Sequence, residues 1–213
     1  MNDARQEILG RIRKSLGDVS ANRAENYEEV ARGYVQAGTL DTESKLALFE
    51  DRLRDYDAMV YRCSRVTLRE TIAEALKHRG KVQMLVPEGI DPECLPIDSV
   101  EFVRDNSLSY EQLDRSQGVL TTCATAIALS GTIVLRHSAR DGRRALTLIP
   151  DYHLCIVHAS QVVETVAEGI RALGNPTDPI TTISGPSATS DIEMTRIKGV
   201  HGPRTLDVIM VVD

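Results

Sequence analysis

The sequence predicts a single α/β domain whose mixed, mostly parallel sheet has helices on both faces, preceded by a helical arm. Apolar runs of strand length alternate with helical segments between residues 58 and 115. Strands joined by helices of this length are typical of a parallel sheet covered on both sides. A chain of 213 residues can build one sizeable core and is short for two full domains. We therefore expect a helical arm and linker over residues 1–40 and the α/β domain over residues 41–213.

The arm begins with an amphipathic helix over residues 3–16. Ile8, Ile12 and Leu16 recur on one face, and basic side chains occupy much of the rest of its surface. Residues 17–26 are polar and aperiodic, as expected of a linker. The apolar face of the helix must be buried somewhere, and the sequence leaves open whether it docks on its own body or on a partner subunit.

The remaining elements follow from periodicity and from turn residues. We expect a short helix at 27–36, a longer one from Thr42 with Leu46, Phe49 and Leu53 on one face, and helices at 67–78, 110–115 and 161–173. Expected strands cover residues 58–61, 81–86, 100–103, 118–122, 131–137, 145–149, 153–157, 180–183 and 206–212.

The middle of the chain differs from the rest because four strand-like runs between residues 118 and 157 have no long helix between them. Such runs favour antiparallel pairing, and Asp141-Gly142 is a suitable hairpin turn. We expect a β-rich insertion or edge here. Gly174 then suits the end of the helix that leads back to the sheet.

Composition excludes several classes of protein. The net charge is −6, whereas a general nucleic-acid binder shows a basic stripe and a protein adhering to an anionic membrane is usually basic. No apolar run approaches the roughly 20 residues that span a bilayer, and the N-terminus lacks the apolar core of a secretory signal. We expect a cytoplasmic protein with neither nucleic-acid nor membrane partners. The sequence leaves open whether it forms a homo-oligomer.

The four cysteines lie about thirty residues apart and form no C-x-x-C pair. This spacing matches neither a zinc knuckle nor an iron–sulfur run, so we expect no metal and no redox cofactor on this chain. Neither G-x-G-x-x-G nor a Walker A loop is present, which argues against dinucleotide or ATP sites of those kinds. The cysteines are expected to be buried, reduced thiols: Cys63, Cys94, Cys123 and Cys155.

The densest group of site-like residues lies at 184–204, S-G-P-S-A-T-S-D-I-E-M-T-R-I-K-G-V-H-G-P-R. Gly185 precedes a proline, which predicts a turn directly after a strand. Ser190 fits a capping box, and a helix start facing strand ends favours anions. We therefore expect Gly185, Ser187 and Ser190 to bind an anion through backbone and hydroxyl groups.

The same stretch supplies the candidates for proton transfer or orientation, Asp191, Glu193 and His201. His201 lies between two glycines, and a histidine near its ordinary pKa of ~6.5 can act as acid or base at neutral pH. Asp191 and Glu193 are two residues apart and do not share a helix face. One of them is therefore expected to face the site while the other caps a helix or is solvated.

A second cluster of hydroxyls and glycines lies at residues 121–132. Its Ser130, Gly131 and Thr132 are expected to form the opposite wall of the site, because both clusters follow strands. Ligands of doubly wound sheets bind outside the carboxyl ends of the strands, so we expect the two clusters to meet there.

Three further histidines lie in strand-like runs, where a histidine is more often a core or edge residue than a ligand. They are His137, His153 and His158. Asp151 and His153 alternate along one run, which permits both to face a substrate without requiring it.

Several stretches together resemble the LUD domain family, the group that contains lactate utilization protein C. They are G-P-S-A-T-S-D-I-E, G-V-H-G-P and the last strand, with S-G-T-I-V-L and L-I-P-D-Y-H-L-C-I-V upstream. The resemblance covers roughly residues 45–213. It implies a fold similar to that of ribose-5-phosphate isomerase, glucosamine-6-phosphate deaminase and the CoA transferases.

The resemblance also implies a role in oxidising L-lactate to pyruvate together with two partner proteins that carry iron–sulfur clusters. This chain would be a non-redox component binding a small anion such as lactate, pyruvate or phosphate. One residue departs from the family pattern: Leu129 stands where members often have glutamate. If that glutamate is catalytic elsewhere, this chain binds without turnover.

Two alternatives remain open at the level of sequence. One is a stand-alone enzyme acting on a phosphorylated or CoA-type substrate, by analogy with the fold group. The other is a pure assembly module that uses the N-terminal helix and the acidic surface as contacts.

Overall fold

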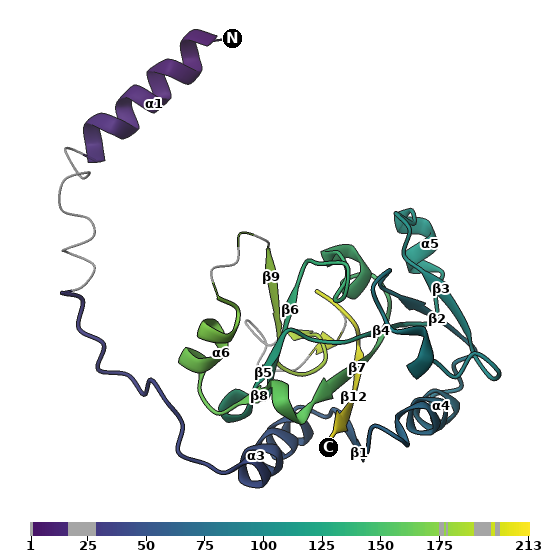
Figure 1. Cartoon of the computed structure of the whole chain (residues 1–213). Helices are drawn as coiled ribbons and strands as arrows, with labels where there is room; N and C mark the ends of the chain where they lie inside the picture. The colour runs from purple at the N-terminus through teal and green to yellow at the C-terminus, as the bar shows by residue number, and fades with distance from the viewer. Residues whose placement is uncertain (1, 17–28, 175–176, 178, 190–196, 199–200) are drawn as a thin grey trace. The chain divides into compact units, whose positions relative to one another are not determined.

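The computed structural model describes residues 2–16, 29–174, 177, 179–189, 197–198 and 201–213. The chain divides into two compact units, Met1–Tyr34 and Val35–Asp213 (Figure 1). The first unit contains helix α1 (Asn2–Leu16), which confirms the helix expected there. The linker expected at residues 17–26 lies outside the described residues.

A six-stranded sheet forms the centre of the second unit, and its strand order is β1-β12-β7-β4-β2-β3. All five neighbouring pairs are parallel. The last strand of the chain therefore lies inside the sheet, between β1 and β7. The strands are β1 (Met59–Cys63), β2 (Gln83–Val86), β3 (Glu101–Arg104), β4 (Val119–Thr121), β7 (Tyr152–His158) and β12 (Thr205–Val211).

A second sheet of four strands, in the order β8-β5-β6-β9, forms the expected β-rich part of the domain. The pairs β5–β6 and β6–β9 are antiparallel, while β5–β8 is parallel. A short antiparallel pair, β10–β11, accompanies it. The strands are β5 (Thr125–Ile127), β6 (Thr132–Arg136), β8 (Val162–Val163), β9 (Ile180–Ile183), β10 (Ala188–Thr189) and β11 (Ile197–Lys198).

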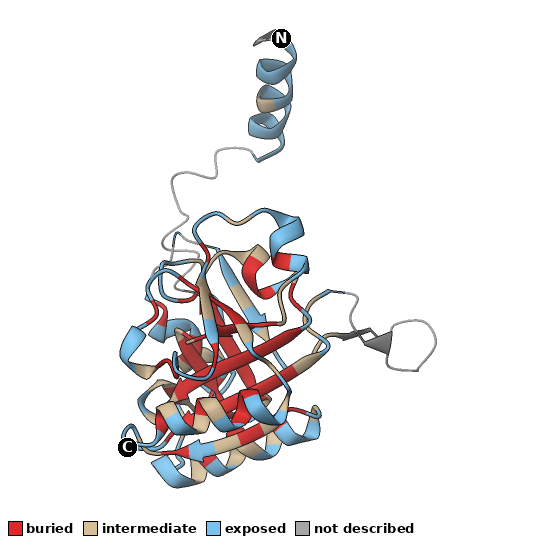
Figure 2. Cartoon of the chain, turned by 90° about the vertical axis from the view of Figure 1, so that its right-hand side faces the viewer, coloured by how far each residue is buried: buried red, intermediate tan, exposed pale blue. Residues whose placement is uncertain are grey.

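The alternation of side chains along β12 shows how the layers stack. Leu206, Val208 and Met210 face a core shared with helix α3 (Thr42–Asp55) and the four-stranded sheet. Ile209 and Val211 face the opposite core, under helix α4 (Leu68–His78). Buried residues are concentrated in the strands between these layers (Figure 2). The α/β class with helices on both faces of a mostly parallel sheet is therefore confirmed.

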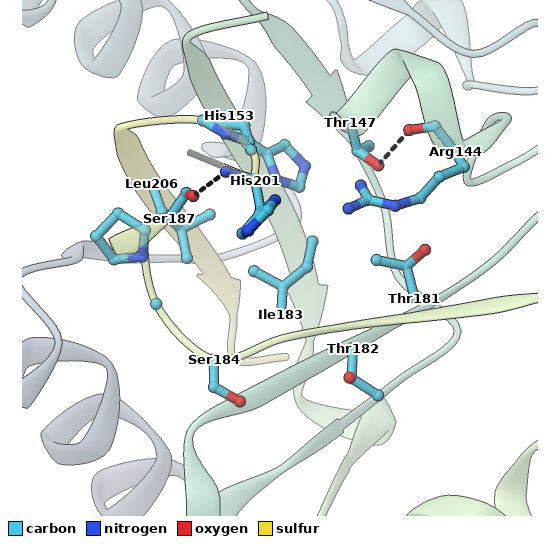
Figure 3. Close-up of a pocket in the computed structure, with 14 residues that line it drawn as sticks. Arg144, Thr147, His153, Thr181, Thr182, Ile183, Ser184, Ser187, His201 and Leu206 are labelled. Carbon is cyan, nitrogen blue, oxygen red and sulfur yellow. Dashed lines mark hydrogen bonds between the residues drawn. The ribbon is translucent and has the colours of Figure 1, made fainter. Parts of the chain in front are cut away.

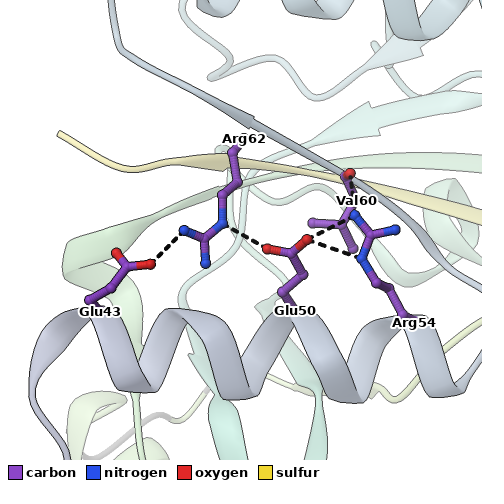
Figure 4. A network of polar contacts seen from close by, with 5 residues as sticks. All are labelled: Glu43, Glu50, Arg54, Val60 and Arg62. Atoms are coloured by element: carbon purple, nitrogen blue, oxygen red, sulfur yellow. Dashed lines mark hydrogen bonds and ion pairs between the residues drawn. The ribbon is translucent and has the colours of Figure 1, made fainter.

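Helix α3 is held to β1 by a cluster of charged side chains (Figure 4). Glu50 accepts from Arg54 at 2.8 Å and from Arg62 at 2.7 Å, and Arg62 also reaches Glu43 at 2.7 Å. Burial raises the pKa of Glu50, but the hydrogen bonds from Arg54 and Arg62 outweigh it and hold that pKa below its ordinary value. The carboxylate therefore stays charged and joins helix to strand.

Two smaller helices complete the domain. Helix α5 (Tyr110–Asp114) agrees with the expected element. Helix α6 (Val166–Ala172) begins later than expected because Thr165 caps it, accepting from the N–H of Glu168 at 3.2 Å. The preceding residues form a 3₁₀ turn (Ala159–Gln161) and strand β8. Gly174, with φ of +69°, follows the helix as predicted.

Three other expectations are wrong. Residues 29–36, the described part of the helix expected at 27–36, contain no helix. Residues Arg144–Thr147 form a 3₁₀ turn instead of a strand. The runs at 118–122 and 153–157 pair in parallel inside the large sheet instead of forming antiparallel hairpins.

Asp141 explains why its turn is not a hairpin. Its buried carboxylate accepts from the hydroxyl of Thr122 at 3.1 Å and from the N–H of Arg136 at 3.0 Å. These bonds hold the turn against the last residue of β6 and the residue after β4, so Asp141 joins two strand ends instead of forming a hairpin. Among the described helices, none is long and apolar enough to cross a membrane.

Candidate functional site

A pocket of about 260 Å³ lies between the two sheets, at the amino ends of β7 and β12 and beside the end of β9. Figure 3 shows the side chains that surround it. Its walls come from the turn before β7, from β9 and the segment after it, and from the approach to β12. It is lined by Arg144, Thr147, His153, Thr181, Thr182, Ile183, Ser184, Gly185, Pro186, Ser187, His201, Gly202, Pro203 and Leu206.

The expected position at the carboxyl end of the parallel sheet is wrong for this stretch. Residues 184–204 follow β9, which belongs to the smaller sheet, and they lead into the first residue of β12. His153 and Leu206 are partners in the β7–β12 ladder, one position in from the start of both strands. The pocket therefore lies at the amino edge of the large sheet.

Arg144 supplies the positive charge of the pocket. Its guanidinium projects into the cavity towards the histidines (Figure 3). Within the described part of the chain it has no carboxylate partner. A planar guanidinium donates two parallel hydrogen bonds to a carboxylate, which makes Arg144 a suitable group for a small organic acid.

His153 is the most unusual side chain of the pocket. It is 1% exposed, and its Nε2 lies 2.8 Å from the hydroxyl of Thr121. Its Nδ1 has no hydrogen-bond partner among the described residues. Burial lowers the pKa of His153 to about 4, so the ring is neutral near pH 7. A buried polar atom without a partner is costly, so this Nδ1 is a candidate polar group at the edge of the pocket.

Ser187 joins the segment after β9 to the segment before β12, and both segments line the pocket. Its N–H donates to the carbonyl of Pro203 at 2.8 Å, and its hydroxyl accepts from the N–H of His201 at 3.0 Å. Among the described residues, no acceptor takes the hydroxyl proton of Ser187, so it can be donated to a ligand. The imidazole of His201 also lines the cavity, so Gly185, Ser187 and His201 lie together as the sequence suggested.

Gly185 has a steric reason for being glycine. Its φ is +83°, and a Cβ at this position would lie 2.5 Å from the Cβ of Tyr56. The turn after β9 therefore packs against the end of α3, which fixes the pocket wall to the body of the domain.

The second expected cluster meets the first but does not line the cavity. The hydroxyls of Ser130 and Thr132 lie 2.7 Å apart, and Thr132 reaches Ser184 at 2.7 Å. Gly131, with φ of +59°, ends a 3₁₀ turn that packs on Arg52. These three residues support the wall behind Ser184 instead of facing the pocket.

Three candidates, Ser190, Asp191 and Glu193, lie in residues 190–196, outside the described residues. Leu129 is 48% exposed and lies outside the lining of this pocket. Asp151 precedes β7 and forms an exposed ion pair with Arg204 at 2.7 Å. His137 contacts the hydroxyl of Thr181 at 2.9 Å. In the described residues, no group of three or more His, Cys, Asp or Glu side chains could hold a metal ion.

Arg144 and His153 are the site residues that sequence reasoning missed. Arg144 directly precedes the strand expected at 145–149 and carries no signal of its own. The sequence favours a core or edge position for His153, although its alternation with Asp151 permits contact with a substrate. His153 is indeed in the core, but the cavity reaches its ring. No local pattern distinguishes such a histidine, because its exposure depends on residues 181–187, which are distant in the sequence.

The fold and pocket define an α/β protein with a small cavity lined by an arginine and two histidines, and sequence comparison supplies its family. The profile of the LUD domain family matches residues 46–211, so this chain belongs to that family. The resemblance noted from the sequence is confirmed.

Relatives are similar over most of their length. A lactate utilization protein C of Deinococcus radiodurans is 42% identical over 98% of this chain and 96% of its own. An uncharacterized protein of Neisseria meningitidis is 36% identical over 75% of this chain and 73% of its own. A crystal structure of a DUF162 family protein from Deinococcus radiodurans, 42% identical, matches with a TM-score of 0.71 over 81% of this chain and 99% of that one.

Proposed function

We propose that this chain is a cytoplasmic lactate utilization protein that binds a small 2-hydroxy or 2-oxo acid, lactate or pyruvate, in the pocket beside His153. The observation that carries the proposal is His153, which lines the same small cavity as Arg144 and whose buried Nδ1 lacks a partner among the described residues. The name of the relative from Deinococcus radiodurans supports lactate as the substrate class.

The two groups suit the two ends of such an acid. The guanidinium of Arg144 would bind the carboxylate, and a neutral His153 would donate Nδ1–H to the adjacent hydroxyl or keto oxygen. Thr121, bonded to Nε2, would favour this tautomer by donating its own proton. Ser187 and the backbone beside Gly185 would complete the enclosure of the carboxylate.

Oxidation of L-lactate to pyruvate removes two electrons and two protons. As part of the same proposal, this chain holds the acid and the electrons pass to iron–sulfur clusters on partner proteins, as the family resemblance implies. His201, which lines the pocket, would accept a proton, with Asp191 and Glu193 as further candidates. This chain would then have no cofactor of its own and would act as a non-redox subunit.

Isothermal titration of the purified chain with L-lactate, pyruvate and ribose 5-phosphate tests the proposal. We expect saturable binding of lactate or pyruvate, weakened about tenfold or more in Arg144→Gln because a charge-assisted hydrogen-bonded pair is lost. Arg171→Gln, at an exposed position of α6, is the matched control and should bind as wild type.

Three outcomes separate the alternatives. Binding of the sugar phosphate alone would favour a stand-alone enzyme on phosphorylated substrates. Absence of binding to all three acids would favour a pure assembly module. Equal loss of binding in Arg144→Gln and Arg171→Gln would contradict the assignment of the pocket.

A further inference from the structure

A second and larger hollow lies at the opposite edge of the parallel sheet. This groove of about 870 Å³ is lined by segments that follow β1, β2, β4 and β7, and so by the carboxyl ends of these strands. It is separate from the pocket beside His153, with which it shares no lining residue.

The strand order places the groove at a switch point of the fold. β2 lies between β3 and β4. The chain leaves β2 towards β3 on one side, whereas from β4 it continues towards β7 on the other. Connections that diverge in this way leave a crevice at the carboxyl ends, where ligands of open α/β sheets bind. Gly89 and Thr122, which follow β2 and β4, both line the groove.

The start of helix α4 also opens into the groove. This helix has 11 residues and follows β1 directly, and its N-terminal residue Leu68 lines the hollow. Thr67 makes no capping bond to the first turn; its hydroxyl instead lies 3.2 Å from the N–H of Ser64. The first-turn N–H groups of α4 therefore lack a side-chain cap, and such an end attracts anions.

Cationic side chains reinforce this end. Arg65, two residues after β1, and Arg140, in the segment after β6, both line the groove. Within the described residues, neither guanidinium has an ion-pair partner. Burial lowers the pKa of His158, at the end of β7, and the charges of Arg65 and Arg140 lower it further. Both arginines and His158 therefore line one groove.

Carboxylates limit the kind of ligand. Glu70, Asp91 and Glu93 line the same groove, and Arg69 is engaged with Asp98 at 2.5 Å. The groove as a whole therefore carries charges of both signs. It suits a molecule with a concentrated negative group at one end and hydrogen-bond donors elsewhere.

We propose that the groove at the carboxyl edge binds a phosphate-bearing small molecule of nucleotide size. Its phosphate lies against the N-terminus of α4 between Arg65 and Arg140. The remainder of the molecule extends along Asp91 and Glu93, whose carboxylates accept hydrogen bonds from it, while Glu70, in the first turn of α4, lies nearer the phosphate. This site is independent of the acid-binding pocket, so each can be present without the other.

The proposal is tested by titrating the full chain with pyrophosphate and with adenosine diphosphate. Binding is measured by calorimetry and by the phosphorus NMR resonances of the probe. We expect saturable binding of at least one probe, weakened about tenfold or more in Arg65→Gln and in Arg140→Gln. Both residues are exposed, so the variants should fold, which circular dichroism checks.

Arg144→Gln is the matched control because it removes a guanidinium from the other pocket. It should leave binding of the phosphate probes unchanged even if lactate binding is lost or was never present. Absence of saturation up to about 10 mM of either probe, weaker than any specific site, would overturn the proposal. So would probe binding that Arg144→Gln abolishes and that both Arg65→Gln and Arg140→Gln retain.

Discussion

At the scale of single residues, burial gives His153 chemistry that its sequence position does not indicate. Its ring is enclosed between the two sheets, and burial alone lowers its pKa to about 4. A neutral imidazole keeps one N–H donor over the physiological range. The same burial makes the residue a liability in acid, because the unfolded chain binds a proton there more readily than the folded one.

This difference predicts a defined loss of stability in acid. The folded pKa of about 4 lies below the ordinary value of 6.5. The contribution of His153 is therefore fully present above pH 6.5 and is lost as the pH falls towards 4, by roughly 3 kcal/mol. Urea unfolding of wild type and His153→Gln should show the difference between their unfolding free energies shrinking across this window. A difference that stays constant between pH 6.5 and 4 would contradict the lowered pKa of His153.

Gly185 gives a second prediction at this scale. Alanine there must adopt φ of +83° and also contact Tyr56, whereas Gly80 has φ of +64° and no atom within 4 Å of the place a Cβ would occupy. Gly80→Ala should cost about 1 kcal/mol, the strain of a left-handed residue. Gly185→Ala should cost more and should also weaken lactate binding. Thermal unfolding measures both variants. Equal losses of stability in Gly80→Ala and Gly185→Ala would show that the contact with Tyr56 contributes nothing.

At the scale of elements, the contact between α4 and β12 depends on one buried ion pair. Asp207 on β12 is fully buried, and Arg79 at the end of α4 donates to it at 2.6 and 2.9 Å. The hydroxyl of Tyr152 adds a third bond at 3.1 Å. Burial and the neighbouring charge of Asp207 raise the pKa of Tyr152, so this hydroxyl remains a donor.

Loss of Arg79 should therefore destabilise the domain strongly. Arg79→Ala leaves the carboxylate of Asp207 buried without its counter-charge, which costs about 3 kcal/mol or more. Arg69→Ala is the control: its partner Asp98 is 87% exposed, so the loss should stay below about 1 kcal/mol. Urea midpoints give both values. The double variant Arg79→Met, Asp207→Leu should recover much of the loss, and its failure to do so would contradict the explanation.

At the scale of the whole molecule, the core lies entirely in the second unit. The first buried apolar residue along the described chain is Leu46. The segment before α3 is held by carboxylates, since Glu164 accepts from the N–H groups of Thr39 and Leu40 at 2.6 and 2.7 Å, and Glu168 from Gly38 at 3.0 Å. Residues from 35 onward thus contain what the domain requires to fold.

Deletion of residues 1–34 should leave the domain folded. We expect the melting temperature to change by less than about 4 °C, equivalent to under 1 kcal/mol for a domain of this size. Binding of lactate should persist, whereas capture of partner proteins should fall if α1 is a docking helix. Circular dichroism measures the melting temperature, and a large drop would show that the arm contributes to the core.

The local elements were largely predictable because their signals are local. The apolar spacing of Leu46, Phe49 and Leu53 placed α3, and the apolar runs placed all six parallel strands close to their observed bounds. Errors fell where a short apolar run lacks its own periodicity, as at residues 145–149. There, tertiary packing of Leu146 selected a 3₁₀ turn.

The candidate site was predictable in part for the same reason. Turn chemistry identified Gly185, Ser187 and His201, which the structure brings together. Arg144 was missed because an isolated arginine carries no signal of its partners. The site was predicted at the wrong edge of the sheet because the strand at 180–183 was expected to belong to the large sheet, whereas it lies in the smaller one.

The sequence by itself determined the class of fold, the family and the residues of the loop at 184–204, since each follows from local pattern or direct similarity. Only the tertiary structure decided that β12 inserts between β1 and β7 and that the described residues 184–187 and 201–203 line a pocket at the amino edge. It also decided that His153 is buried beside Arg144 and that a second groove opens at the carboxyl edge. These features depend on pairing and burial between residues far apart in the chain, which local pattern does not encode.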